Sequence, residues 1–366
     1  MPAVPRDPRA TVAFVESPVQ LLNVLEWAHA PGPLLDGVPA QQRAETPDLS
    51  DLTVVVLSPT DPMSRGQLRR MAELARDAGA KVRWEEARAG LTAPLQTVGG
   101  LAPMLRRAER IVIGDPFSRY VQLLLTAARA RDLVVVDDGT ATMEFVSQLA
   151  RGERLVRWHR RGSRAGAREL LFAPVSAAAR RRLSPARRRA VTVFSAMPIE
   201  APEGVMVAPN TFGWTRARFG PPRLTKGADL VGTSLVETGV VDPVSYLEAV
   251  GVLARTHGVT RYFAHRRESA DKLHTLHART GLEIVRPDLP LELIARRGPV
   301  GRTVLSFPST VVHTLPLALA GTGVSVVVCD IDPRWLTERA SPRAQGFLDG
   351  VTGTARKAHG LATVAA

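Results

Sequence analysis

Residues 133–140, with the sequence Leu-Val-Val-Val-Asp-Asp-Gly-Thr, constrain the fold of this chain more than any other stretch. Four apolar residues in a row predict a strand covered on both faces, as the strands of parallel sheets are. Asp137 and Asp138 follow at its carboxyl end, where open α/β sheets bind their ligands. Two adjacent carboxylates repel each other, and this repulsion raises the pKa of one of them. A carboxylate with a raised pKa suits the role of a general base near neutral pH. The alternative is that both side chains only cap the following turn or helix.

Short apolar runs like this one recur along the chain and alternate with helix-like segments. Such alternation predicts an α/β fold with doubly wound parallel sheets. The predicted strands are residues 11–16, 52–57, 81–84, 110–113, 133–136, 191–194, 205–207, 229–231, 260–264, 282–285, 303–307 and 324–329.

The length of 366 residues favours two domains. The stretch 210–225, which contains Gly-Pro-Pro at 220–222, is typical of a linker. We therefore expect an N-terminal Rossmann-like domain over residues 1–222 and a C-terminal Rossmann-like domain over residues 223–345. Residues 346–366 are expected to form a C-terminal tail.

The chain carries a formal net charge of +13, and residues 151–189 form a dense basic segment. One interpretation is a solvated face, and the other is a surface for an anionic acceptor or for a membrane. Trp158 and Phe172 are the aromatic residues of this segment, which is too few for base stacking. We therefore expect no nucleic-acid partner.

The remaining composition excludes several classes of protein. The single cysteine, Cys329, excludes an internal disulfide and favours a reduced compartment. The sequence contains neither a signal-peptide core nor an apolar run of membrane-spanning length, so we expect a cytoplasmic protein, with peripheral contact at the inner membrane face through the basic segment. A lysine-containing phosphate loop and a Gly-x-Gly-x-x-Gly after the first strand are missing, and the histidines lack cysteine partners, so no cofactor or metal site is predicted.

Polar residues follow several of the predicted strands and form the candidate site. In the second half they could offer hydroxyls, an imidazole and main-chain amides to one anion. Taken singly, each is explained as well by helix capping or by a structural histidine. The candidates in the second half are Gly232, Thr233, Ser234, His265, Arg266, Ser309 and Thr310, and those in the first half are Ser17, Gln20, Asp115, Ser118 and Gly139.

Four of these motifs, in this order, resemble those of the bacterial CMP-sialic-acid-dependent sialyltransferases of the polysialyltransferase-like and lipooligosaccharide sialyltransferase type. They are Ser-Pro-Val-Gln at 17–20, Asp-Asp-Gly at 137–139, His-Arg-Arg-Glu at 265–268 and Ser-Thr at 309–310. The resemblance covers residues 11–330, although each motif is short. It implies a GT-B fold, with two Rossmann-like domains facing across a cleft, and an inverting transfer without a metal or other cofactor.

The resemblance also implies roles for individual residues. Asp138, or Asp137 beside it, would remove the proton from an acceptor hydroxyl. His265 and the hydroxyls of Ser309 and Thr310 would hold the phosphate of a CMP-activated sugar. Arg266 stands where the family has proline, and its guanidinium would strengthen the binding of a phosphate or carboxylate.

The sequence thus predicts a glycosyltransferase that moves sialic acid, or a related acidic sugar, from a CMP-activated donor to a hydroxyl of a glycan. The basic segment would suit an anionic glycan acceptor. Two other functions remain open at this level: an arginine-rich, non-catalytic binder of an anionic polymer or nucleic acid, and a member of the family that binds CMP without turnover.

Overall fold

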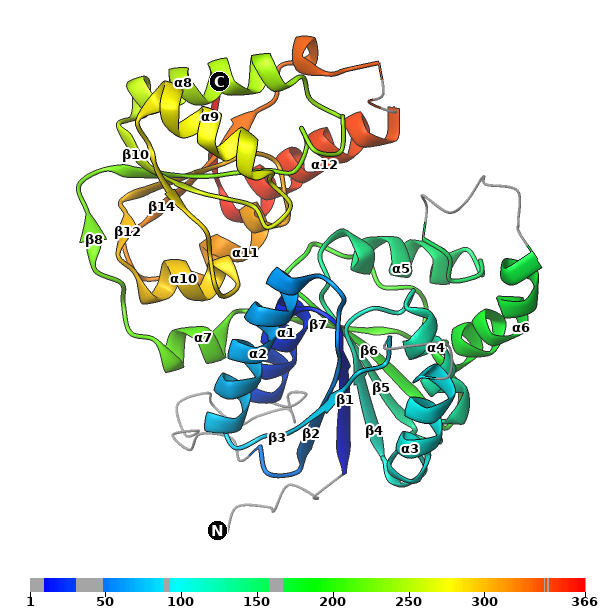
Figure 1. Ribbon diagram of the computed structural model, residues 1–366. Helices are drawn as coiled ribbons and strands as arrows, with labels where there is room; N and C mark the ends of the chain where they lie inside the picture. Colours follow the sequence, from blue (N-terminus) through cyan, green and yellow to red (C-terminus); the bar gives the residue numbers. More distant parts are fainter. Residues whose placement is uncertain are drawn as a thin grey trace. The chain divides into compact units, whose positions relative to one another are not determined.

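The computed structural model describes residues 10–30, 49–88, 93–157, 167–338, 340 and 342–365. Residues 31–48, and residues 158–166 of the basic segment, lie outside the described residues. The chain divides into two compact units, Met1–Asn210 (unit 1) and Thr211–Ala366 (unit 2). Each unit is a parallel sheet with helices on its faces (Figure 1).

Unit 1 is built on a seven-stranded sheet in the order β3-β2-β1-β4-β5-β6-β7, with every neighbouring pair parallel. This is the doubly wound order: strands are added toward one edge of the sheet from β1 to β3 and toward the other edge from β4 onward. The strands are β1 (Thr11–Val15), β2 (Leu52–Leu57), β3 (Lys81–Glu85), β4 (Arg110–Ile113), β5 (Asp132–Val136), β6 (Ala190–Ser195) and β7 (Met206–Pro209).

The apolar run that predicted a doubly covered strand is indeed central. β5 pairs with both β4 and β6, and its four apolar residues are buried in the core. Ser17, Asp61 and Ser118 cap helices that cover this sheet, because each side chain accepts a main-chain N–H of the first turn. The helices are α1 (Pro18–His29), α2 (Pro62–Asp77), α3 (Ala93–Arg107), α4 (Arg119–Ala127), α5 (Thr140–Ala150) and α6 (Ala167–Arg182).

Unit 2 repeats the same plan with a six-stranded parallel sheet in the order β11-β10-β9-β13-β14-β15. Its strands are β9 (Ala228–Val231), β10 (Val259–Phe263), β11 (Glu283–Val285), β13 (Thr303–Ser306), β14 (Ser325–Asp330) and β15 (Ala362–Ala365), and β8 (Leu224–Thr225) pairs separately with β12 (Val300–Gly301). Its helices are α7 (Gly213–Arg218), α8 (Pro243–His257), α9 (Ala270–Thr280), α10 (Leu291–Arg297), α11 (Val311–Ala318), the short 3-10 helix η3 (Pro333–Trp335) and α12 (Pro342–His359).

The division between the units falls earlier than the expected boundary at residue 222. The stretch predicted to be a linker contains α7, which packs on α10 and α11. Arg296 of α10 also donates a hydrogen bond to the carbonyl of Phe219, with an Nε–O distance of 3.1 Å. Side-chain packing therefore joins this stretch to unit 2 despite its prolines.

The expected tail over residues 346–366 is wrong as well. These residues continue α12 and then form β15, which pairs in parallel with β14. Val351 and Ala355 of α12 are buried together with Val312 and Val328. α12 is thus part of the core of unit 2, and β15 extends the sheet beside β14.

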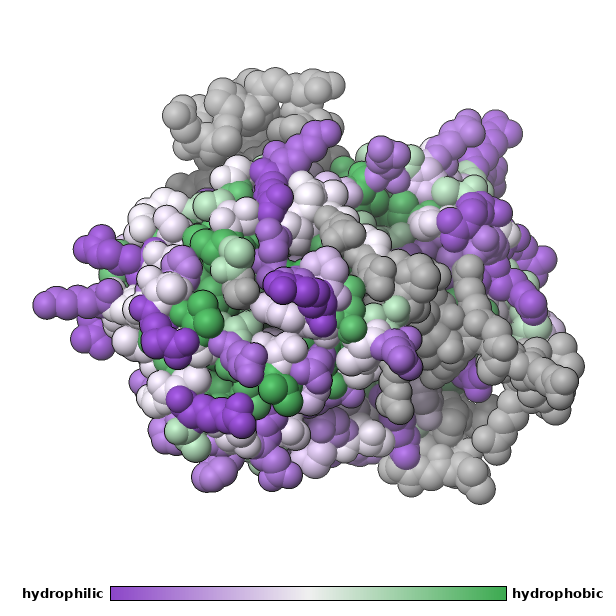
Figure 2. Space-filling view, turned by 90° about the horizontal axis from the view of Figure 1, so that it is seen from above, coloured by the Kyte–Doolittle hydropathy of each residue, from purple (hydrophilic) through white to green (hydrophobic). Residues whose placement is uncertain are grey.

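On the face shown in Figure 2, hydrophilic side chains project outward and hydrophobic residues lie in small groups between them. Among the described helices, none combines the length and the apolar character needed to cross a membrane.

Candidate functional site

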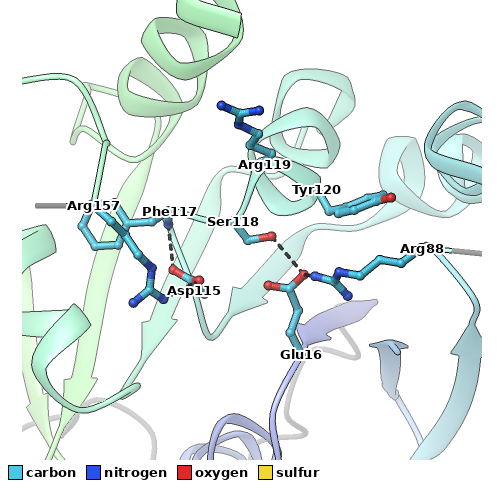
Figure 3. A pocket seen from close by; sticks show the side chains of 8 residues that line it. All are labelled: Glu16, Arg88, Asp115, Phe117, Ser118, Arg119, Tyr120 and Arg157. Carbon is cyan, nitrogen blue, oxygen red and sulfur yellow. Dashed lines mark hydrogen bonds and ion pairs between the residues drawn. The ribbon is translucent and has the colours of Figure 1, made fainter. Parts of the chain in front are cut away.

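A pocket of about 250 Å³ opens at the carboxyl edge of the sheet in unit 1, around the ends of β1 and β4 (Figure 3). This is the switch point of the doubly wound order, where α/β sheets of this type bind ligands. The residues that line it are Glu16, Arg88, Asp115, Phe117, Ser118, Arg119, Tyr120 and Arg157.

Glu16 follows β1 directly and lies on one side of this pocket. The hydroxyl of Ser118 donates to its Oε1 at 3.0 Å, and Arg88 forms an ion pair with the same oxygen. Burial raises the pKa of the Glu16 carboxyl, and the neighbouring Asp115 adds to this effect, whereas Arg88 and Ser118 oppose it. A carboxyl group with a raised pKa in a pocket is a candidate for binding or proton transfer.

Asp115 lies on the other side of the pocket and is held from two directions. Its Oδ1 accepts the main-chain N–H of Phe117 at 2.9 Å, and its Oδ2 accepts from the guanidinium of Arg157 at 2.7 Å. The same nitrogen of Arg157 is 3.7 Å from Oδ2 of Asp138. Arg157 thus connects the pocket to the carboxyl end of β5.

Burial is the largest influence on the guanidinium of Arg157 and lowers its pKa. The carboxylates of Asp115 and Asp138, with a smaller part from Glu144, reverse this and raise the pKa overall. Arg157 therefore stays charged and sets the electrostatic character of this edge.

Asp137 and Asp138 occupy very different surroundings although they are adjacent. The Asp137 side chain is 3 % exposed, and its Oδ2 accepts hydrogen bonds from the Ser195 hydroxyl at 2.9 Å and from the Ala196 N–H at 3.2 Å. Its Oδ1 is buried and has no hydrogen-bond partner among the described residues. The Asp138 side chain is 21 % exposed and lies beside Arg157. The geometry therefore gives Asp137 a contact that fixes the end of β6, and it leaves the Asp138 side chain partly exposed beside Arg157.

Burial raises the pKa of the Asp137 carboxyl, although its hydrogen bonds act in the opposite direction. The turn that separates it from α5 depends on Gly139, whose φ of 66° lies in the left-handed region that favours glycine. The main-chain N–H of Asp138 donates to the hydroxyl of Thr142 at 2.9 Å. These contacts fix the direction in which Asp138 leaves the strand.

Two other residues predicted for the site of unit 1 have structural contacts instead of lining the pocket. Ser17 caps α1 by accepting the N–H of Gln20 at 3.2 Å. Gln20 is buried and accepts the N–H of Glu16 at 2.7 Å, while it packs so closely on Gly114 that a Cβ there would come within 2.3 Å of its Cγ. Of the predicted residues, Asp115 and Ser118 line the pocket, whereas Glu16, Arg88 and Arg157 were not predicted as part of a site.

In unit 2 the predicted polar residues come from three neighbouring strands. Gly232 to Ser234 follow β9, His265 follows β10, and Ser309 and Thr310 follow β13. β9 lies between β10 and β13, and the sheet order reverses between β9 and β13. The structure therefore brings these residues to the carboxyl edge at the switch point of unit 2, as the sequence predicted.

Burial, together with the positive charges of Arg266, Arg267 and Lys272, lowers the pKa of His265 to about 4. The imidazole is consequently neutral at pH 7. Its Nδ1 accepts the main-chain N–H of Arg267 at 3.2 Å, so the ring hydrogen lies on Nε2. Nε2 has no partner among the described residues, and it is therefore a neutral donor available to a ligand.

This geometry predicts the titration of His265. We expect its ring to titrate near pH 4, well below the ordinary 6.5, because burial and the three cations disfavour the imidazolium. Arg266→Gln removes one of these charges and should shift the midpoint upward. Nitrogen-15 NMR, with the resonance assigned through its loss in His265→Asn, measures the midpoint and shows whether Nε2 carries the hydrogen at neutral pH. A midpoint at or above 6.5 would contradict the neutral-donor assignment.

A buried network holds the turn that carries His265. Oε2 of Glu268 accepts the main-chain N–H of His265 at 2.6 Å, and Oε1 accepts the Tyr262 hydroxyl at 2.6 Å and pairs with Nζ of Lys272 at 2.8 Å. Lys272 also donates to the carbonyl of Thr233 at 3.1 Å, which ties this turn to the end of β9. Lys272 thus joins the turns after β9 and β10 through its ion pair with Glu268 and its hydrogen bond to Thr233.

Gly232 makes this close approach possible. A Cβ on it would lie 2.3 Å from Oε2 of Glu268 and 2.4 Å from the hydroxyl oxygen of Tyr262. Thr233 is buried, and its carbonyl accepts from Lys272. These two residues therefore serve the network, and their role toward a nucleotide remains a prediction.

Ser309 and Thr310 precede α11, yet their side chains do not cap it. Thr310 occupies the cap position without a side-chain hydrogen bond to the helix, and the carbonyls of both residues accept main-chain N–H groups of α11. Neither hydroxyl has a partner among the described residues. The alternative explanation of a simple helix cap is therefore wrong for this pair.

The comparisons with known proteins concern the fold. No protein-family model and no curated protein matches the sequence. An α/β-galactoside α-2,3-sialyltransferase from the marine bacterium Photobacterium phosphoreum is similar in structure, with a TM-score of 0.52 and 7 % identity over 96 % of this chain and 98 % of that one. Two further structures have lower TM-scores. The E. coli heptosyltransferase WaaC has a TM-score of 0.40 and 12 % identity over 88 % of this chain and 90 % of that one. Acinetobacter baumannii MurG has a TM-score of 0.38 and 10 % identity over 97 % of this chain and 85 % of that one. The predicted GT-B fold of two Rossmann-like units is confirmed.

Proposed function

We propose that this protein is an inverting glycosyltransferase that moves sialic acid, or a related acidic sugar, from a CMP-activated donor to a hydroxyl of a glycan. The observation that carries the proposal is the set of unused polar groups at the switch point of unit 2. Nε2 of His265 and the hydroxyls of Ser309 and Thr310 can all donate hydrogen bonds, and none of them has a structural partner among the described residues. Such donors suit one phosphate of a leaving nucleotide.

In this proposal the acceptor binds in unit 1 and Asp138 is the general base. Asp138 is the more exposed member of the Asp137–Asp138 pair, and Arg157 places it next to the pocket. The pocket offers carboxylates for sugar hydroxyls, aromatic rings for the apolar face of a sugar, and arginines for an anionic substituent. Transfer requires unit 1 and unit 2 to present these groups to each other, and this juxtaposition is part of the proposal.

The donor would lose CMP, which carries a single phosphate. We propose that neutral hydrogen-bond donors and the exposed Arg266 meet its charge without a divalent cation. A CMP group needs less neutralisation than a nucleoside diphosphate, because it has fewer charged oxygens. The nucleotide specificity of the site therefore tests the proposal directly.

We expect CMP to raise the melting temperature of the protein more than UMP, AMP, GMP or UDP at the same concentration. A ligand that binds only the folded state stabilises it by about 2.7 kcal/mol at one hundred times its dissociation constant. Differential scanning fluorimetry measures the shift.

Ser309→Ala/Thr310→Val is the matched variant, because it removes two hydroxyls that have no structural partner among the described residues. The melting temperature without nucleotide should stay unchanged, while the shift with CMP is lost. Stabilisation by UDP but not by CMP would overturn the donor assignment.

A further inference from the structure

Arginines gather at the amino edge of the sheet in unit 1, which is the edge opposite the pocket. Because all strands of this sheet are parallel, the connections that lead into them lie along that edge. Arg106 and Arg107 end α3 just before β4, and Arg129 and Arg131 lie between α4 and β5. All four side chains are exposed.

The last turn of α6 and the connection from α6 to β6 add three more exposed arginines, Arg181, Arg187 and Arg188. We call these seven exposed arginines the arginine edge. Other arginines of the same connection are used inside the fold: Arg182 donates to the carbonyl of Ala130 at 2.7 Å, and Arg189 donates to the carbonyl of Ser184 at 2.9 Å. The basic segment therefore contributes only part of this surface, and the rest comes from the end of α3 before β4 and from the connection between α4 and β5.

Main-chain contacts bring the three connections together. The N–H of Ala190 donates to the carbonyl of Arg131 at 2.8 Å, and the N–H of Asp132 donates to the carbonyl of Glu109 at 3.4 Å. The exposed acidic residues on the connections into β4, β5, β6 and β7 are Glu109, Glu200 and Glu203. Positive charge consequently dominates this half of the edge.

Exposed apolar side chains lie beside these charges. Met206 begins β7, next to β6 in the sheet, and its side chain is 53 % exposed, while Val207 is 36 % exposed. They are the most exposed large hydrophobic residues in the described part of unit 1. The turn before β7 also contacts the turn before β6, because a Cβ on Gly204 would lie 3.2 Å from Cβ of Pro185. Arginines and a projecting methionine thus share one surface.

We propose that the arginine edge, with Met206 and Val207, is a docking surface for an anionic phospholipid bilayer. Guanidinium groups pair with lipid phosphates, and each cation near an anionic surface strengthens binding about fivefold. Met206 and Val207 would enter the interfacial region, where apolar side chains add to electrostatic attraction. Nucleic acid is the less favoured partner, because none of these connections contains an aromatic residue for stacking.

Vesicle co-sedimentation of the full chain tests this proposal. Wild-type protein should sediment with vesicles of phosphatidylglycerol and phosphatidylcholine in a 1:1 mixture, should not sediment with phosphatidylcholine alone, and should be released as salt is raised. Arg187→Glu/Arg188→Glu should lower the partition coefficient of the protein onto the anionic vesicles about twentyfold or more. Met206→Ser should also weaken it, while binding to a duplex DNA probe stays unchanged.

Arg255→Glu/Arg279→Glu is the matched control. It makes the same change of charge on exposed arginines of α8 and α9 in unit 2 and should keep wild-type sedimentation. The proposal is overturned if wild-type protein ignores anionic vesicles, if both double variants lose sedimentation equally, or if Arg187→Glu/Arg188→Glu loses only DNA binding. Stabilisation by CMP is measured on each variant, so that loss of vesicle binding can be distinguished from loss of the proposed transferase function.

Discussion

Asp138→Asn is expected to lower sugar transfer by about 10²- to 10⁴-fold, which is the usual contribution of a positioned general base. The amide keeps the size of the side chain but cannot accept the proton of an acceptor hydroxyl. Because Asp138 belongs to unit 1 and the proposed nucleotide donors to unit 2, stabilisation by CMP should remain at the wild-type level. Transfer of a labelled sugar from CMP-sialic acid to a panel of glycans measures the first effect, and differential scanning fluorimetry measures the second.

Asp137→Asn is the matched control, since it makes the same chemical change one residue away. Asp137 is buried and accepts hydrogen bonds from Ser195 and Ala196. Weakening these contacts should lower the free energy of unfolding by about 1–3 kcal/mol, which is typical when a buried hydrogen-bonding group loses its partner. Full transfer activity in Asp138→Asn would exclude Asp138 as the base and would direct attention to Glu16, a carboxyl group that lines the pocket and whose pKa is raised by burial.

Glu268→Ala is expected to cause the largest loss of stability, about 3–5 kcal/mol in the free energy of unfolding. Glu268 is 0 % exposed and Lys272 is 8 % exposed, so the substitution leaves a buried ammonium group without its main partner. It also removes the acceptors for the Tyr262 hydroxyl and the His265 N–H. Because this N–H fixes the His265 turn, stabilisation by CMP should be lost as well. Urea denaturation and fluorimetry measure the two effects.

Glu237→Gln provides the comparison for this prediction. Glu237 is a second partner of Lys272, but its carboxylate is 3.4 Å from Nζ and is 18 % exposed. Partly exposed ion pairs contribute about 1 kcal/mol or less, so this variant should remain close to the wild type. If Glu237→Gln destabilised the protein as much as Glu268→Ala, the ion pair with Glu268 would not be the contact that holds the two turns together.

Much of the fold was predictable, because short apolar runs identify strands that are buried on both faces. The runs at 11–16, 52–57 and 133–136 all became strands. In the structure, Ser17 and Ser118 cap the helices that follow β1 and β4. Three helices of unit 1 were not predicted. α3 contains Gly99, Gly100 and Pro103, which obscure a helical pattern.

α5 follows directly on the Asp137–Asp138 pair, and α6 lies within the basic segment and contains Pro174. α12 and β15 were missed for a different reason. A strand added to the edge of a sheet is fixed by its neighbour β14, and the contribution of a neighbour cannot be seen in the local sequence.

By itself the sequence determined that acidic and hydroxyl side chains stand at the carboxyl ends of parallel strands, because strand direction and strand ends are local properties of the chain. Only the tertiary structure decided which of these groups are buried and which partners they contact. Asp137 turns toward Ser195, which is 58 positions away, and Asp138 toward Arg157. Glu16 meets Arg88 across 72 positions, and Asp115 meets Arg157 across 42. Burial and pairing depend on partners that folding brings together, and they distinguish two adjacent aspartates that the sequence leaves equivalent.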